Sequence, residues 1–132
     1  MRKLTPFVFI FFLFCVTSGY SQSQTKAASD PYTWDFGQVK QGEILKHSFI
    51  FKNDSNKTIY IEDVNTSCGC TASDIEDETL KPKASAPLNV TFKTKGYRGP
   101  VTQFIYVHTD NKDNPLVKYT IKAEVLPKEN KQ

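Results

Sequence analysis

The sequence predicts an all-β fold. Runs of residues that alternate between apolar and polar side chains recur along the chain, a pattern typical of strands with one buried face. Glycine, proline, asparagine and aspartate cluster between these runs, as expected for tight turns. No segment shows helical spacing of apolar residues over three turns. Six or seven short strands within about 95 residues indicate an antiparallel immunoglobulin-like β-sandwich of about seven strands.

Each strand is expected where the alternation is clearest. Trp34 and Phe36 predict a first strand whose aromatic side chains enter the core before a glycine turn. The run 101–108 carries bulk on both faces, so we expect this strand to be central in its sheet. The acidic segment 74–80 is expected to be a loop. The other expected strands cover residues 45–52, 59–62, 88–93 and 119–125, with turns at 37–42, 53–56, 81–83, 95–100 and 110–115.

The first residues have the pattern of a secretory signal peptide. Arg2 and Lys3 precede the apolar run 7–16, which is too short for a stable membrane anchor. Gly19 and Ser21 supply the small residues of a cleavage site, so we expect cleavage after Ser21. The predicted organisation is a signal peptide at 1–21, a polar tether at 22–31, the sandwich domain at 32–126 and a polar tail at 127–132. We expect a periplasmic or secreted protein with no transmembrane anchor after cleavage.

Composition and motifs exclude several function classes. Of 17 basic residues, Arg2 and Lys3 would leave with the signal peptide, which brings the charge close to balance with 14 acidic residues. Such a chain lacks the basic excess of a nucleic-acid-binding protein. The sequence also contains no serine-hydrolase elbow, no zinc-protease helix motif and no phosphate-binding glycine loop. We therefore predict that the protein is not an enzyme.

The segment Cys68-Gly69-Cys70, followed by Thr71, is the one place where the residues indicate chemistry. In an exported protein two cysteines are usually oxidised, and a Cys68–Cys70 ring would be small, strained and easily reduced. Gly69 can adopt dihedral angles that bring the two sulfurs together. Left open, two thiolates suit a soft ion such as Cu(I), whereas zinc needs two further ligands. An intrachain disulfide, a metal site, inert thiols and pairing with another chain all stay open.

The chain has two histidines, His47 and His108, both in expected strands. His47 shares the apolar face of Leu45 and Phe49, which favours a hydrogen-bonded core histidine. The alternative is that His47 joins Cys68 and Cys70 as a third metal ligand. His108 lies at a strand end before a turn, where we expect an exposed side chain.

Several motifs resemble a family of exported bacterial domains known as domain of unknown function 1573. They are Asp35-Phe36-Gly37-Gln38-Val39 with Gly42-Glu43, the run His47 to Asn53, Ser67-Cys68-Gly69-Cys70-Thr71, Lys81-Pro82 to Phe92, Gly96 to Gly99, and Asp110-Asn111 to Pro115. The resemblance covers about residues 32–125. It implies a sandwich similar to the abnormal-spindle, hydin and major-sperm-protein domains, and an origin in bacteria such as the Bacteroidetes.

Within that family, Cys68, Gly69 and Cys70 match the Cys-Gly-Cys motif, and His47 matches the histidine that begins the second strand. The resemblance implies no reaction. It also implies that the four glycosylation sequons, among them Asn53-Asp54-Ser55, carry no glycan.

Two hypotheses about function follow. The first is an exported, non-enzymatic module for protein interaction or envelope assembly, with an unknown protein partner in the cell envelope and no cofactor. The second is a thiol site at Cys68 and Cys70, supported by Gly69 and Thr71, that carries Cu(I) or takes part in redox exchange.

Overall fold

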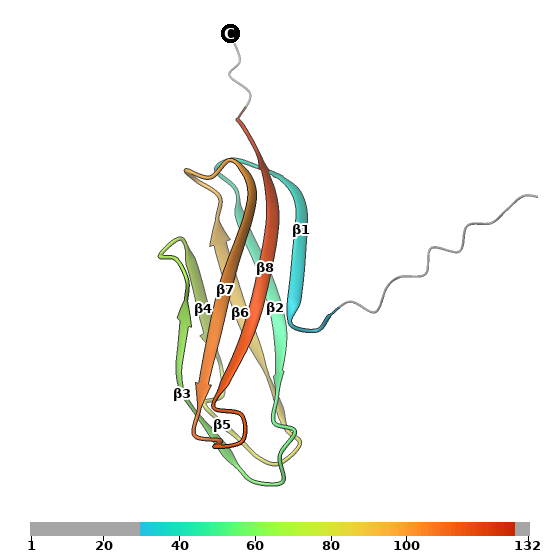
Figure 1. Cartoon of the computed structure of the whole chain (residues 1–132), viewed down its shortest axis with the longest axis vertical. Helices are drawn as coiled ribbons and strands as arrows, with labels where there is room; N and C mark the ends of the chain where they lie inside the picture. Colours follow the sequence, from blue (N-terminus) through green and yellow to red (C-terminus); the bar gives the residue numbers. More distant parts are fainter. Residues whose placement is uncertain (1–29, 129–132) are drawn as a thin grey trace, which may run out of the picture.

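The computed structural model describes residues 30–128, which form a two-layered β-sandwich (Figure 1). The predicted signal peptide and nearly all of the predicted tether lie outside the described residues, as do residues 129–132. The eight strands are β1 (Thr33–Lys40), β2 (Ile44–Lys52), β3 (Ile59–Thr66), β4 (Thr71–Ile75), β5 (Thr79–Leu80), β6 (Ser85–Lys93), β7 (Gly99–Thr109) and β8 (Leu116–Leu126). The predicted immunoglobulin-like sandwich is confirmed.

The strands divide into a larger sheet, in the order β1-β8-β7-β3-β5, and a smaller sheet, in the order β2-β6-β4. β7 is the middle strand of the larger sheet, as its bulk on both faces predicted. The one departure from antiparallel pairing is β1, which runs parallel to β8. Because β1 continues into β2 of the other sheet, no tight turn forces it to run antiparallel to β8.

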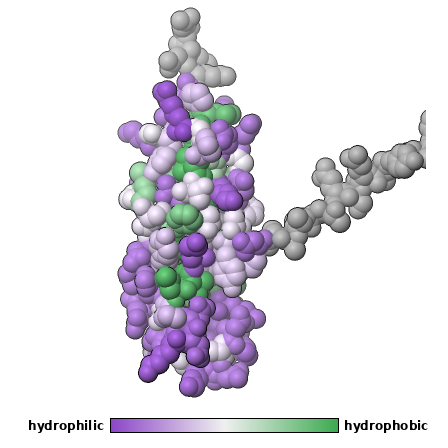
Figure 2. Space-filling model, viewed as in Figure 1, coloured by the Kyte–Doolittle hydropathy of each residue, from purple (hydrophilic) through white to green (hydrophobic). Residues whose placement is uncertain are grey.

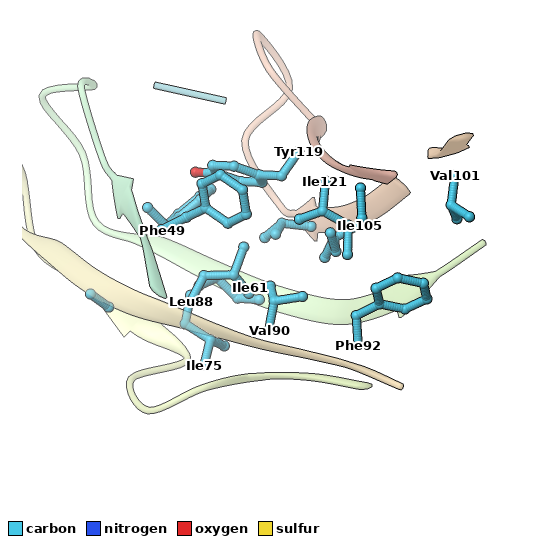
Figure 3. Packing of buried hydrophobic residues seen from close by; sticks show 14 of the residues in the cluster. Phe49, Ile61, Ile75, Leu88, Val90, Phe92, Val101, Ile105, Tyr119 and Ile121 are labelled. Carbon is cyan, nitrogen blue, oxygen red and sulfur yellow. The ribbon is translucent and has the colours of Figure 1, made fainter. Parts of the chain in front are cut away.

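The two faces of each sheet differ as the alternation predicted. The outer face seen in Figure 2 is mostly polar, with apolar side chains only in small, separate patches. The inner faces meet in one continuous core (Figure 3). Among its members are Phe49, Leu88, Val90 and Phe92 from the smaller sheet and Ile61, Ile105, Tyr119 and Ile121 from the larger one. Each such buried side chain contributes roughly 1.5–3 kcal/mol to stability.

The first strand differs from the sequence prediction. Phe36 packs against the core, but Trp34 is 42% exposed. The chain also does not turn at Gly37. A β-bulge between Asp35 and Gln38 lets the strand continue to Lys40, with Gly37 at a φ of 67°. The Asp35 carboxylate accepts a hydrogen bond from the Gly37 N–H at 2.8 Å, which stabilises the bulge.

The acidic segment 74–80 was expected to be a loop, and that prediction is confirmed for residues 76–78 but wrong for both ends of the segment. β4 extends to Ile75 and pairs with β6, and β5 pairs with the start of β3. Ile75 and Leu80 are buried in the core, while the acidic side chains between them point to solvent. The exposed acidic residues made the segment resemble a loop, because an edge strand needs only a few inward apolar residues and its sequence can otherwise be polar.

The turn between β3 and β4 and the loop between β6 and β7 lie at the same end of the sandwich (Figure 1). The Lys93 N–H at the end of β6 donates to the Cys70 carbonyl at 3.0 Å, which joins the two connections. Residues 30–128 contain no helix with the length and apolar character needed to span a bilayer.

Candidate functional site

Cys68 and Cys70 lie in the tight turn that connects β3 of the larger sheet to β4 of the smaller sheet. The Thr71 N–H closes the turn by donating to the Cys68 carbonyl at 3.1 Å. The Thr66 hydroxyl lies 3.0 Å from the carbonyl oxygens of both Cys68 and Thr71, so its proton bridges the two sides of the turn. The backbone around the cysteines is therefore held from both strands.

The Cys68 sulfur has two polar neighbours. The Tyr97 hydroxyl, from the β6–β7 loop, lies 2.8 Å from it, and the Cys70 N–H donates to it at 3.1 Å. The Cys70 thiol also interacts with the Tyr97 side chain, but less strongly than Cys68 does, and within residues 30–128 no backbone N–H donates to the Cys70 sulfur. Cys68 and Cys70 are both free thiols and both are half-buried.

A chain of hydrogen bonds continues from Tyr97 to the larger sheet. The Gln103 amide nitrogen lies 3.4 Å from the Tyr97 hydroxyl, and its amide oxygen accepts from the Ser67 hydroxyl at 2.7 Å. The Ser67 oxygen in turn accepts from the Phe104 N–H at 3.0 Å. Gln103 is buried on β7, so the side-chain amide that contacts the Tyr97 hydroxyl has a fixed position in the sandwich.

The electrostatics of the site distinguish Tyr97 from Cys68. The hydroxyl of Tyr97 lowers the pKa of the Cys68 thiol, and the Cys70 N–H lowers it further, because both stabilise the thiolate. The pKa of Tyr97 is raised well above its ordinary value, first by its hydrogen bond to Cys68 and then by Cys70. Tyr97 thus holds its proton more firmly than an ordinary tyrosine, whereas the pKa shift of Cys68 favours loss of its proton.

Gly69 and Thr71, the predicted supporting residues, both lie in or beside the cysteine turn. Gly69 does not use a left-handed φ, and a methyl group at its Cα would meet no atom within 4 Å. The Thr71 side chain is buried, and its hydroxyl is the one buried side-chain polar atom in residues 30–128 that lacks a hydrogen-bond partner. Thr71 therefore serves the site through its backbone rather than its side chain.

The structure does not bring His47 to the cysteines. His47 pairs with Val90 on β2, and its ring is stacked on Trp34 with centroids 4.1 Å apart. Burial alone lowers its pKa, and no hydrogen bond contributes. The part of the chain that the structure describes has no group of three or more His, Cys, Asp or Glu side chains placed to hold a metal. What the cysteine turn offers is two sulfurs, the number that Cu(I) accepts.

Tyr97, Gln103 and Ser67 were not identified from the sequence. Gln103 carries a usable signal, because it occupies an inward position among Val101, Ile105 and Val107. A polar side chain at such a position must find a partner. Tyr97 lies between Gly96 and Gly99 in a turn, which gives no sign that it faces the cysteines.

Solved structures with this fold come from several kinds of protein. A protein of unknown function from Porphyromonas gingivalis W83 superposes with a TM-score of 0.62 at 20% identity, over 70% of this chain and 44% of that one. The VesB protease of Vibrio cholerae gives a TM-score of 0.60 at 11% identity, over 70% of this chain and 30% of that one. The PapD-like domain 7 of human CEP192 gives 0.58 at 12% identity, over 74% and 83%. These likenesses concern the fold alone.

The chain spans less than half of the length of the first two of these proteins. A comparison with curated proteins finds no match. One family model matches residues 28–125, which include both cysteines and all eight strands except the last residue of β8. The chain therefore belongs to the family described as "Protein of unknown function (DUF1573)".

Proposed function

We propose that this protein is an exported, non-enzymatic module that contacts another protein of the cell envelope through the end of the sandwich that carries Cys68, Cys70 and Tyr97. The observation that carries the proposal is the hydrogen-bonded link between the β3–β4 turn and the β6–β7 loop. A surface whose loops are already fixed loses little conformational entropy on binding. The same loop exposes Lys95 and Arg98 beside Tyr97, and tyrosine and arginine are enriched at the centres of interfaces.

Other parts of the sandwich give less support for a binding surface, and the site gives little support for a hydrolase. The outer face in Figure 2 has no large apolar patch. Neither histidine lies beside Cys68, whose hydrogen-bond partners are Tyr97 and the Cys70 N–H, so the site lacks the cysteine–histidine pair of a hydrolase. The fold also makes up 30% of the VesB chain, which supports its use as a module within larger proteins.

The test is capture of partners from an envelope fraction on the immobilised protein, with variants that separate the two ends. We expect Lys95→Glu/Arg98→Glu to weaken binding at least about tenfold, the effect of about 1.4 kcal/mol. The matched control is Lys57→Glu/Lys112→Glu, which reverses two exposed charges in the loops at the other end and should keep binding. A Cys68→Ser/Cys70→Ser variant should fold and keep the partner. Equal loss in both charge variants, or none in either, would contradict the proposal.

Export is tested separately by the intact mass of protein recovered from the host's periplasm or medium. A mass that begins at Gln22 is expected, because cleavage after Ser21 follows from the small residues there. Full-length protein retained in the cytoplasm would contradict this part of the proposal.

A further inference from the structure

We propose that Cys68 and Cys70 form a thiol–disulfide exchange site in which Cys68 attacks, Cys70 resolves, and cysteine pairs of other exported proteins are the substrates. This inference rests on the export proposed above and departs from the non-enzymatic module by giving the cysteine turn a redox reaction. It does not rest on partner binding at the loops, because exchange can be measured with a small disulfide alone.

The first argument is the direction of the hydrogen-bond chain that ends at Cys68. A backbone N–H can only donate, so Phe104 donates to the Ser67 oxygen and leaves the Ser67 proton free for the Gln103 amide oxygen. The Gln103 amide nitrogen can only donate as well, so it donates to the Tyr97 oxygen. The Tyr97 proton is left free for the Cys68 sulfur, 2.8 Å away, and Tyr97 must be the donor whenever Cys68 is a thiolate.

The consequence is that two hydrogen bonds are donated to one sulfur once Cys68 is a thiolate. Tyr97 and the Cys70 N–H both donate to Cys68, and a sulfur that accepts two hydrogen bonds is better satisfied as a thiolate than as a thiol. The thiolate is the nucleophile in thiol–disulfide exchange. Burial is only partial, so the sulfur is both activated and accessible.

The second argument is the asymmetry of the pair. Exchange needs one thiolate that attacks and one thiol that stays protonated until the mixed disulfide has formed. A two-sulfur Cu(I) site needs both sulfurs as thiolates. Cys68 receives both donors, while Cys70 contributes its N–H to its neighbour. The geometry therefore favours exchange over carriage of a soft metal.

The reaction balances with the substrate's own sulfurs. In one direction the Cys68 thiolate attacks a partner disulfide, a Cys68–partner bond forms, and one partner thiolate leaves and takes up a proton. Cys70 then loses its proton to solvent and attacks the Cys68 sulfur, which forms the Cys68–Cys70 disulfide and releases the second partner thiol. The two cysteines are oxidised by two electrons and the partner disulfide is reduced by two.

The hydrogen bonds also indicate which direction is favoured. They stabilise the reduced form, because the thiolate accepts them more strongly than a disulfide sulfur can. The oxidised form is a ring closed between residues i and i+2, which is strained. Both effects make the oxidised pair a donor of disulfides to substrate dithiols.

The first experiment measures which cysteine reacts and why. Reduced protein is alkylated with iodoacetamide over a pH series, and the label is located by peptide mass. Cys68 is expected to react at least about fivefold faster than Cys70 at neutral pH, because its thiolate fraction is larger. Tyr97→Phe should shift the pH profile of Cys68 upward. The thiolate fraction at neutral pH then falls, higher nucleophilicity of the thiolate offsets part of the loss, and the net rate is expected to fall about threefold.

Two further variants distinguish a hydrogen-bond effect of Tyr97 on Cys68 from a general change in the structure. Gln103→Glu places a carboxylate where the amide donates, so the Tyr97 proton should turn away from Cys68 and the profile should shift upward as in Tyr97→Phe. Tyr60→Phe alters an exposed tyrosine on β3 and should leave the profile unchanged. Thermal melts show that each variant folds. Equal rates at both cysteines, or the same profile in all variants, would overturn the assignment.

The second experiment follows exchange with oxidised glutathione by intact mass. Because the ring is strained, a large excess of oxidised glutathione drives the reaction and takes up the two electrons. The native protein should then pass through a short-lived adduct to the Cys68–Cys70 ring, with the mass of two hydrogen atoms lost. Cys70→Ser should accumulate the glutathione adduct on Cys68, because no resolving thiol remains, and Cys68→Ser should react more slowly. A ring that never forms would overturn the proposal. So would stoichiometric copper in the purified protein with both thiols protected from alkylation, which would establish a soft-metal site instead.

Discussion

The indole ring of Trp34 lies flat on the imidazole ring of His47, with centroids 4.1 Å apart and the ring planes inclined by 10°. Trp34 is on β1 of the larger sheet and His47 on β2 of the smaller one, so the stack joins the two layers at one edge of the sandwich. Phe49 meets His47 edge-on at 4.5 Å and continues the contact into the core. The stack bridges the two sheets without the intersheet disulfide of antibody domains.

The first prediction concerns the pH dependence of stability. Burial lowers the pKa of His47 below its ordinary 6.5. Between the lowered pKa and 6.5, His47 is therefore protonated in the unfolded chain but neutral in the folded chain. The contribution of His47 to the free energy of unfolding should therefore be constant above pH 6.5 and fall as the pH drops from 6.5 through the lowered pKa. Melting curves across this window should show the loss in the native protein and its absence in His47→Phe.

His108→Asn is the matched control and should keep the dependence of the native protein. The carboxylates of Asp30 and Asp54 act in a different window. Hydrogen bonds from Tyr32 and Lys52 respectively lower their pKa from 3.8, so their contributions disappear only in more acidic solution. A native protein that gains stability below pH 6.5 would mean that the imidazolium ion binds the indole face, contrary to this prediction.

The second prediction is that Trp34→Ala lowers the free energy of unfolding by about 1–2 kcal/mol. It removes a stacked aromatic pair, worth about 0.5–1.5 kcal/mol, together with part of its buried area. Tyr60→Ala removes a more exposed aromatic side chain from β3 of the larger sheet and should change stability by less than about 0.5 kcal/mol. Urea unfolding measures both values. Equal effects of the two substitutions would show that the Trp34 stack contributes little.

Much of this fold follows from the alternation of apolar and polar residues, and the parts that do not follow share a physical cause. Trp34 looks like a core residue by type, but β1 is an edge strand and its tryptophan covers a histidine rather than filling the interior. The short strands β4 and β5 are also edge strands, and the exposed acidic residues in and between them made them resemble a loop in the sequence. Edge strands bury few side chains, so their sequences carry a weak pattern.

The sequence predicted the two cysteines of the site but not the tyrosine that contacts them. Two cysteines around one glycine in an exported protein indicate chemistry wherever they lie, so Cys68 and Cys70 could be chosen directly. Tyr97 could not, because its contact with Cys68 depends on which loops meet at one end of the sandwich. That information resides in strand pairing across 29 residues of chain, which no local pattern reports.

The third prediction concerns Asn53, which is 1% exposed at the end of the sandwich opposite the cysteines. Its amide nitrogen donates to the carbonyls of Lys57, Leu80 and Lys81 at 2.8–3.0 Å, and its oxygen accepts from Ser55. Asn53→Asp would set a carboxylate against three carbonyl oxygens and should cost about 2–4 kcal/mol. Urea unfolding measures the loss.

Asn56→Asp, in the same loop but exposed, is the matched control and should cost less than about 0.5 kcal/mol. Near-native stability of Asn53→Asp would show that the buried amide does not tie the two loops together. The same burial makes Asn53 inaccessible as a glycan acceptor in the folded protein, whatever the host.

The fourth prediction compares two buried threonines. The Thr71 hydroxyl has no partner within residues 30–128, whereas the Thr94 hydroxyl donates toward the carbonyls of Lys40 and Glu43 and accepts from the Glu43 N–H at 2.8 Å. Valine has nearly the same shape as threonine and needs no hydrogen bond. Thr71→Val should therefore stabilise the protein by about 0.5–1 kcal/mol, and Thr94→Val should destabilise it by about 1–3 kcal/mol.

Thermal melts of the two valine variants separate these cases by sign, with a shift of about 4–8 °C for each kcal/mol in a domain of this size. Thr71→Val should also leave the alkylation profile of Cys68 unchanged, because Thr71 holds the cysteine turn through its backbone N–H and carbonyl rather than its hydroxyl. A Thr71→Val variant that loses stability would mean that the hydroxyl has a partner in solution. In that case the interior beside Cys70 would have to admit water or a ligand.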